Sequence, residues 1–410
     1  MNVPFFLVLL APAFGGGMEA RMKRAPEVIL MRKEGLAESR TRLASGDDTL
    51  RPALAALLEK AEEALDAGPF SVTNKTTTPP SGDKHDYMSL GIYWWPDPKK
   101  KDGRPYIRRD GERNPESRND AFDSPRLGRL VGAVETLALA YFFTGKEAYA
   151  RRAAVLLRTW FLLPETRMNP HLKYAQGVPG RVTGRGVGII DTVRLMRIPD
   201  AALLLGPSPS WTDADHGALR QWFKAYLDWL RTSTHGKDEG RADNNHGTWY
   251  DAQVACFALF VGDGKTAKEV LSAAGKKRIA GHITPDGRQS RELARTRSFD
   301  YSLFNLQAMF ALARLAEHVD VDLWHFKAKG RIAIESALDY VAPYADARKA
   351  WPHKQITDLN RSRLLPLLQE AAVVYERRQY EALIDQLPDR DTRRSRARLL
   401  QPPGGSKAGE

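Results

Sequence analysis

The chain has 410 residues and is 42% hydrophobic, which is enough for one large helical domain or for two or three average domains. Its formal net charge of +12 favours a polyanionic partner, whether nucleic acid, anionic lipid or an acidic glycan, but does not choose among them. The single cysteine, Cys256, excludes a disulfide within the chain, and we expect its thiol to be buried as a small apolar group.

An apolar run of signal-peptide length covers residues 3–14 and is followed by small residues. Ala20 is a candidate cleavage position, and the run is too short to span a bilayer. The run has no basic residue before it, and Met18 or Met22 is an alternative start of the protein. We expect residues 1–20 to be a signal peptide and the protein to be periplasmic or secreted, with no membrane span.

Helical periodicity dominates the chain after this segment. Residues 27–68 are rich in Ala, Leu, Glu and Arg, and residues 131–141 and 149–160 each place apolar side chains on one helical face, with a break at Thr144-Gly145. Further helices are predicted at residues 189–206, 213–234, 247–261, 266–281, 301–318, 324–343 and 361–386.

Two regions rich in proline and glycine, residues 69–130 and 164–188, interrupt this pattern. Long ordered loops in compact domains are usually functional. Strand-like alternation is scarce, and we find no strict repeat. Successive antiparallel helix hairpins with long loops on one side predict an all-α fold, an α/α barrel (toroid) whose loops form an open cleft. We expect residues 27–386 to form a single domain and residues 387–410 to be a disordered basic tail.

The motif Asn244-Asn245-His246 stands just before an apolar helix. Asparagine is a preferred N-cap, so ordinary capping explains one of the two asparagines, but it does not explain both of them and a histidine. At i, i+4 spacing His246 and Tyr250 share a helical face. The motif therefore marks a candidate site, with Asn244 and Tyr250 as candidate substrate-binding neighbours.

A second group of candidates stands at the start of a later amphipathic helix. Arg295 and Arg297 precede this helix, and Tyr301 begins it. A solvated basic loop would explain the arginines, and Tyr301 could be the first core residue of that helix. A tyrosine at a helix start is half in water, which suits a catalytic phenol equally well. With the asparagine–histidine motif, these residues supply an amide, an imidazole, a guanidinium and a phenol, a set that can hold a carboxylate while a proton moves beside it.

The two loop regions carry further candidates for a binding cleft. Trp94 and Trp95 stand together in the first region, either as core residues or as platforms for sugar rings, since pyranose C–H faces pack on aromatic rings. The candidate cleft-lining side chains of the second region are His171, Tyr174, Gln176 and Arg185.

Cofactor signatures are missing from the sequence. The nine histidines are scattered without metal-ligand spacing, so we predict no metal site. The glycines at positions 184, 186 and 188 have no strand before them and do not form a dinucleotide loop. Because the sequence also lacks a serine nucleophile elbow and a nucleic-acid-binding motif, we expect no cofactor and no nucleic-acid partner.

Several segments together resemble the alginate lyase superfamily of polysaccharide lyases. They include the asparagine–histidine motif, Lys84-His85-Asp86-Tyr87 and Tyr93-Trp94-Trp95-Pro96-Asp97-Pro98, and parts of residues 114–127, 168–176 and 184–191. The likeness covers about residues 80–330, and it is the set, rather than any one segment, that is specific.

The resemblance implies an α/α toroid that cuts uronate polymers by β-elimination, with an acidic polysaccharide such as alginate or a glucuronan as the partner. Carried over by position, it implies Asn245, His246, Arg295 and Tyr301 as the catalytic residues. The spacing from arginine to tyrosine is one residue shorter than in the alginate lyases compared, so Arg297 competes with Arg295 for the role of carboxylate clamp.

The implied chemistry is removal of the C5 proton of a 4-linked uronate, followed by loss of the C4 oxygen. Asn245 and Arg295 would neutralise the neighbouring carboxylate, so that no metal is required. Tyr301 or His246 would remove the proton, and we expect neighbouring arginines to lower the pKa of Tyr301.

Two alternatives remain open on the sequence alone. A glycoside hydrolase on an α/α barrel needs two carboxylates in the cleft, and Asp191, Asp243 and Asp251 are candidates, although no pair stands out. A non-catalytic protein that binds acidic glycans needs only the basic surface and the aromatic residues. The oligomeric state cannot be predicted from the sequence.

Overall fold

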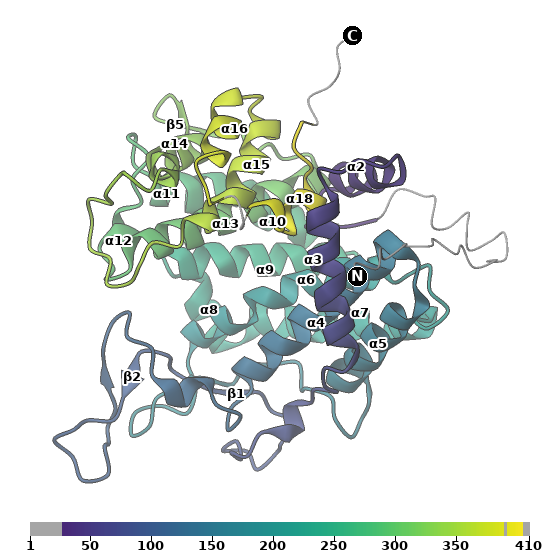
Figure 1. Ribbon diagram of the computed structural model, residues 1–410. Helices are drawn as coiled ribbons and strands as arrows, with labels where there is room; N and C mark the ends of the chain where they lie inside the picture. Colours follow the sequence, from purple (N-terminus) through teal and green to yellow (C-terminus); the bar gives the residue numbers. More distant parts are fainter. Residues whose placement is uncertain (1–26, 389–391, 405–410) are drawn as a thin grey trace, which may run out of the picture.

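The computed structural model describes residues 27–388 and 392–404, and this part of the chain is built mainly of helices (Figure 1), as the predicted all-α fold requires. The longer helices are α2 (Lys33–Ala44), α3 (Arg51–Leu65), α4 (Ser124–Thr144), α5 (Glu147–Leu157), α6 (Arg197–Leu204), α7 (Asp213–Thr232), α8 (Thr234–Gly240), α9 (Asn245–Val261), α10 (Gly264–Ala274), α13 (Ser298–Ala316), α14 (Ala333–Val341), α15 (Leu365–Val374) and α16 (Arg378–Ile384). The predicted signal peptide, residues 1–20, lies outside the described residues.

Helix α9 lies at the centre of the fold and packs against α7, α10 and α13. Its N-terminus is capped by Asn244, whose side-chain oxygen accepts a hydrogen bond from the backbone N–H of His246. It ends at Gly262, whose positive φ of 83° suits a glycine at a helix end. Most residues of α9 are buried, including Cys256, as expected for its thiol. The asparagine–histidine motif therefore stands at the start of a helix that is largely buried.

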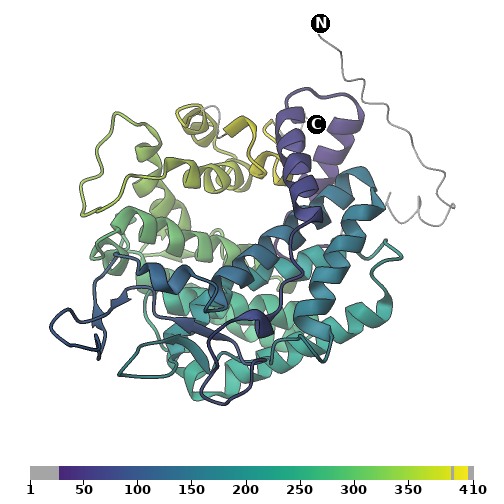
Figure 2. The same ribbon diagram turned by 60° about the horizontal axis from the view of Figure 1, so that its bottom comes forward.

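The C-terminal segment joins the two ends of the helical arc (Figure 2). Helix α18 (Ala397–Leu400) packs against α2, α3 and α15, and Leu399 is fully buried. Arg396 donates to the carboxylate of Glu135 at 2.6 Å. The prediction of a disordered tail is therefore wrong for residues 392–404, because charged and apolar side chains in this segment contact distant helices. Residues 389–391 and 405–410 of the predicted tail lie outside the described part.

Some predicted helices are shorter or divided. Residues 27–68 form two helices, and α14 occupies only part of the predicted 324–343 helix. The first half of that predicted helix is instead a hairpin of β5 (Lys327–Ala328) and β6 (Arg331–Ile332). The turn residues of this hairpin, Lys329 and Gly330, both have positive φ. Residues 186–196 form a 3-10 helix before α6.

Helix α4 is, among the described residues, the one helix long and apolar enough to cross a membrane by length and composition. Two-thirds of its apolar stretch (67%) is buried inside the protein, and it packs against α3, α5 and α6. Its apolar character is thus explained by its place in the core.

The two long loop regions meet at one end of the helical scaffold. Strand β1 (Met88–Leu90) pairs in parallel with β4 (Tyr174–Gly177), although 80 or more residues separate them. Beside them β2 (Trp94–Trp95) pairs antiparallel with β3 (Ile107–Arg108), in the hairpin at the lower left of Figure 1. This pairing brings both predicted loop regions to the same face, next to the N-terminus of α9.

Candidate active site

A cavity of about 700 Å³ lies between the loop face and the helices. Its walls come from the first loop region, the 3-10 helix at residues 186–196, the start of α9 and the segment that leads into α13. The polar side chains that line it, in chain order, are Tyr93, Arg108, Arg113, Ser117, Arg118, Ser124, Gln176, Arg185, Asp191, Arg194, Asn244, Asn245, His246, Arg295, Arg297, Asp300, Tyr301 and Arg363. All four residues that the family resemblance implied as catalytic thus share one cavity.

Asn245 is held by a buried carboxylate. Glu292 accepts hydrogen bonds from the backbone N–H and from the side-chain Nδ2 of Asn245, both at 2.8 Å. Burial raises the pKa of Glu292, against the lowering effect of these hydrogen bonds. The side-chain oxygen of Asn245 is buried and has no hydrogen-bond partner within the described chain. The amide therefore has a fixed orientation, and its oxygen is left as an acceptor for a donor such as a sugar hydroxyl, while one N–H of Nδ2 is not used by Glu292.

His246 is held by a second buried carboxylate, Glu239. Its Nδ1 lies 2.6 Å from Oε1 of Glu239, whose side chain is only 2% exposed. A carboxylate at this position favours the tautomer with the proton on Nδ1, which leaves Nε2 as a lone-pair acceptor. His246 is thus oriented to take a proton through Nε2.

Tyr301 lies in a cluster of three polar side chains. Its hydroxyl is 2.7 Å from that of Tyr93 and accepts a hydrogen bond from Nη2 of Arg295 at 2.9 Å. The guanidinium of Arg295 also lies over the Tyr301 ring, 3.8 Å from its centre. Any negative charge on the Tyr301 oxygen would face two donors.

The pKa of Tyr301 is nevertheless raised well above that of a free phenol. Burial is the largest cause, followed by the neighbouring Tyr93, while Arg295 acts in the opposite direction. Arg295 therefore acts on the pKa of Tyr301 in the expected direction, but burial and Tyr93 outweigh it, so the net shift is upward. In the free protein Tyr301 is a neutral phenol.

The expected carboxylate clamp, Arg295, already has a carboxylate partner. Its Nη2 lies 2.7 Å and its Nε 3.2 Å from the two oxygens of Asp110. Burial would raise the pKa of Asp110, but Arg295 and Thr296 bring it down to about 2, so the pair is ionised. Arg297 is likewise engaged, with Asp300, through Nε and Nη2. Neither arginine offers a free fork to a substrate.

Five of the nine predicted substrate-binding residues line the cavity: Asn244, Trp94, Gln176, Arg185 and Arg297. The Trp94 ring has the guanidinium groups of Arg181 and Arg185 over it, at 5.2 and 5.6 Å. Asn244 serves as the N-cap, as the ordinary structural explanation of one asparagine required.

The other four predicted binding residues are used elsewhere in the described structure. The indole N–H of Trp95 donates a hydrogen bond to the backbone oxygen of Glu112. The hydroxyl of Tyr250 donates one to the backbone oxygen of Leu230. The ring of His171 lies 3.0 Å from a carboxylate oxygen of Asp86. Tyr174 is buried in β4. In a regular strand Tyr174 and Gln176 would share a face, but the positive φ of Gln176 (48°) departs from strand geometry, and only Gln176 lines the cavity.

Sequence reasoning missed several residues of this site. Tyr93 lies inside one of the segments that carry the family resemblance, so the sequence does contain a signal for it. The sequence contains no such signal for three carboxylates, Asp110, Glu239 and Glu292. Each acts through a partner elsewhere in the chain, and the separation ranges from 7 to 185 residues. Buried carboxylates of this kind are visible only in three dimensions.

The carboxylates considered for a hydrolase have other partners. Asp191 lines the cavity but accepts hydrogen bonds from Tyr87, Ser89 and Gln176. Asp251 pairs with the buried Arg278, and Asp243 pairs with Arg291. Of the three, only Asp191 lines the cavity, so these candidates do not supply the pair of cavity carboxylates that a hydrolase needs.

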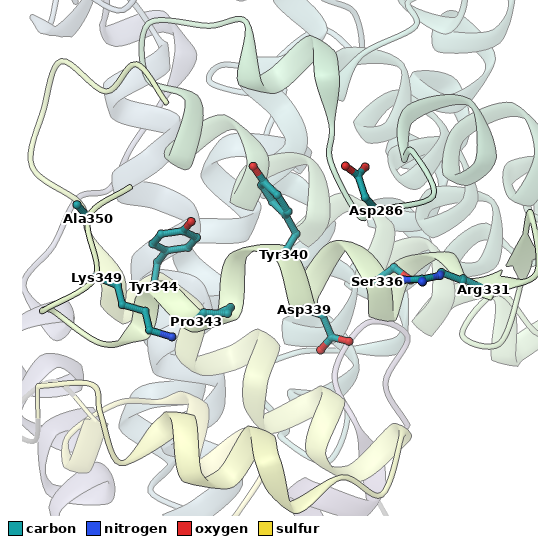
Figure 3. Close-up of a pocket in the computed structure, with 9 residues that line it drawn as sticks. All are labelled: Asp286, Arg331, Ser336, Asp339, Tyr340, Pro343, Tyr344, Lys349 and Ala350. Atoms are coloured by element: carbon teal, nitrogen blue, oxygen red, sulfur yellow. The ribbon is translucent and has the colours of Figure 1, made fainter. Parts of the chain in front are cut away.

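A second cavity, of about 560 Å³, lies around α14. Figure 3 shows that its polar groups diverge: the side chains of Asp339 and Tyr340 point to opposite sides of the helix. It contains none of the predicted site residues. No group of three or more His, Cys, Asp or Glu side chains that could hold a metal ion occurs among the residues at 27–388 and 392–404.

Comparison with known proteins agrees with this geometry. A family model described as alginate lyase matches residues 71–351. The crystal structure of an alginate lyase from Bacteroides ovatus is 37% identical and has a TM-score of 0.87, with 92% of this chain and 99% of that chain covered. Alginate lyase A1-III from Sphingomonas species A1 shares the fold, at 17% identity and a TM-score of 0.55, with 95% and 99% covered.

A variant of A1-III complexed with a tetrasaccharide matches at 18% identity and a TM-score of 0.54, with 89% of this chain and 93% of that chain covered. No curated protein matches the sequence. The family model spans more than half of the chain, and the Bacteroides ovatus structure is matched over nearly all of it. The chain belongs to the alginate lyase family and is a polysaccharide lyase.

Proposed function

We propose that this protein cleaves 4-linked uronate polymers, alginate or a polyglucuronate, by metal-independent β-elimination and leaves unsaturated uronate ends. The observation that carries the proposal is the convergence of Tyr301, His246 and Asn245 on one cavity, each fixed by its own partner. The elimination needs a base near C5, a proton for the C4 oxygen and neutralisation of the carboxylate. These side chains supply all three functions.

Tyr301 is the proposed proton carrier for D-mannuronate or D-glucuronate. In these sugars the C5 hydrogen and the C4 oxygen leave from the same face, so one group can act first as base and then as acid. The Arg295 N–H and the Tyr93 hydroxyl would hold the phenolate oxygen that the base step requires. For L-guluronate, whose groups leave from opposite faces, His246 would be the base and Tyr301 the acid.

Asn245 is the proposed ligand of the reacting carboxylate. One N–H of its amide is used by Glu292, and an amide nitrogen carries two. Hydrogen bonding to the carboxylate stabilises the enolate-like charge that develops when the C5 proton leaves. Arg295 contributes chiefly through the Tyr301 oxygen, because two of its donors face Asp110.

The test is a substrate screen followed by ultraviolet absorbance. Polymannuronate, polyguluronate, polyglucuronate and glucuronate-containing glycosaminoglycans are incubated with the protein, with and without a chelator. Elimination produces a conjugated, absorbing sugar; hydrolysis produces new reducing ends without that absorbance. New reducing ends without absorbance, or activity lost with the chelator and restored by a metal, would contradict the proposal.

We also propose that the protein is exported to the periplasm or secreted, with residues 1–20 as the signal peptide. The support is the apolar run near the N-terminus and the size of the polymeric substrate. Cell fractionation and N-terminal sequencing of the mature protein test this. A cytoplasmic protein that retains residue 1 would contradict it.

A further inference from the structure

Apart from Arg185, which hydrogen-bonds to Gln176, the arginines that line the cavity are of two kinds. Arg108 and Arg295 share the carboxylate of Asp110, and Arg297 and Arg363 share that of Asp300. A substrate carboxylate could use these four only by competing with an internal ion pair. Their positive charge is already balanced within the protein.

Arg113, Arg118 and Arg194 are different. Their side chains line the same cavity but make no hydrogen bond or ion pair within the described residues. Arg113 and Arg118 are exposed and Arg194 is half-buried. Their donors are therefore free to bind an anion that enters the cavity.

The three arginines are also close to one another. Burial, and next the positive charges of Arg113 and Arg194, lower the pKa of Arg118. Grouping cations without a counter-ion is unfavourable, and an incoming anion relieves the repulsion. The main chain leaves room for the group: a Cβ at Gly128 of α4 would lie only 2.3 Å from Nη1 of Arg194. Arg118 is also within electrostatic range of Tyr93, which places the group beside the reacting centre.

The reacting sugar does not need this group. Its carboxylate is bonded to C5, the carbon whose proton is removed, so it must lie beside Tyr301, His246 and Asn245. None of these three forms a hydrogen bond to Arg113, Arg118 or Arg194 in the described structure. A cavity of about 700 Å³ is within the range that encloses ligands of several rings, so it has room for a second sugar.

We propose that Arg113, Arg118 and Arg194 form a receptor for the carboxylate of a second uronate, adjacent to the one that reacts. The inference rests on the proposed function, which it makes more specific: the substrate would be a run of consecutive uronates. A polymer in which every second sugar is neutral would leave the receptor empty.

The experiment measures binding without turnover, in the Tyr301→Phe variant. Two tetrasaccharides are compared by calorimetry, one of consecutive uronates and one in which uronates alternate with a neutral amino sugar. We expect the consecutive tetrasaccharide to bind more tightly. Arg118→Gln together with Arg194→Gln should weaken its binding by about 10- to 100-fold, the usual size for lost charge-assisted hydrogen bonds, and remove most of the preference.

Arg151→Gln is the matched control, because Arg151 is an exposed arginine on α5 outside the cavity. Circular dichroism confirms that the variants are folded. The receptor is contradicted if the double variant keeps the affinity and the preference, or if both tetrasaccharides lose affinity equally. If the otherwise intact protein neither binds nor cleaves any oligouronate, the proposed function itself fails; if it cleaves them and the arginine variants bind normally, only the receptor fails.

Discussion

The two walls of the active-site cavity are fixed in different ways. On the helix wall, Asn245 and His246 at the start of α9 are each held by a buried carboxylate, Glu292 and Glu239. On the loop wall, Tyr93 and Asp110 reach across to Tyr301 and Arg295 through contacts that are partly open to solvent. The helix wall is thus preorganised by the core, whereas the loop wall depends on contacts of Tyr93 with Tyr301 and of Asp110 with Arg295 and Thr296.

This difference separates positioning from chemistry. Groups fixed by buried partners hold their geometry at little cost when the substrate arrives, which suits the recognition of a carboxylate. The phenol that meets the loop wall is the one that must exchange a proton. Variants on the loop wall should therefore change the pH dependence of the rate, in addition to its size.

The largest effect is expected for Tyr301→Phe. Removal of the proton carrier should lower kcat by about 10²- to 10⁴-fold with little change in KM, because general acid–base catalysis contributes that much. The control is Tyr340→Phe, a tyrosine of the second cavity. A Tyr301→Phe protein with normal turnover on polymannuronate and polyglucuronate would remove Tyr301 from the mechanism.

The same phenol should determine the pH dependence. Burial raises the pKa of Tyr301, and the base must be deprotonated, so the reactive fraction in the free protein grows as the pH rises. We expect kcat/KM on polymannuronate or polyglucuronate to increase from neutral pH into the alkaline range until the protein unfolds. A rate that falls steadily above neutral pH would contradict a tyrosinate base.

Glu239→Gln tests the helix wall. The amide keeps the size of the side chain but no longer favours the proton on Nδ1 of His246. By analogy with other partners that orient a histidine, we expect kcat on polyguluronate, for which His246 is the proposed base, to fall about 10- to 100-fold. Glu269→Gln, on the exposed side of α10, is the control. A change in KM alone would mean that His246 only binds the substrate.

Asp110→Asn tests the loop wall. The negative charge of Asp110 raises the pKa of Tyr301 and also orients Arg295. Its removal should move the alkaline rise of kcat/KM to lower pH, while the less ordered Arg295 lowers the maximal rate by about tenfold. Asp346→Asn, which breaks the ion pair with Arg348, is the control. An unchanged pH profile would show that Asp110 does not act through Tyr301.

The two walls also differ in how far the sequence predicts them. Asn245 and His246 belong to a contiguous motif at a helix start, and local capping rules place them correctly. The loop wall brings Tyr93 to Tyr301 across 208 positions, and Asp110 to Arg295 across 185. Local periodicity carries no information about such contacts, which is why Arg295 was expected to be a free clamp.

The fold shows the same limit. The pattern of apolar residues predicts α7, α9 and α13 to within a few residues. Helix α7 buries one continuous stripe, whereas α9 and α13 are apolar and buried on most sides. The pattern does not predict the pairing of β1 with β4, which depends on two short segments far apart in the chain. The segment at residues 392–404 was mistaken for a tail since its partners, Glu135 among them, lie far away in the sequence.

The smallest effect is expected from the two adjacent tryptophans. Trp94 lines the cavity, whereas the indole of Trp95 donates to the backbone of Glu112 and lies outside it. If Trp94 stacks on a sugar ring, Trp94→Ala should raise KM by about three- to tenfold with kcat nearly unchanged, in line with about 0.5–1.5 kcal/mol for an aromatic contact. Trp95→Ala should alter KM less, and its effect should be seen in thermal stability instead. Equal changes in KM for both variants would mean that the hairpin acts as a unit and that the loop wall has no individual sugar platform.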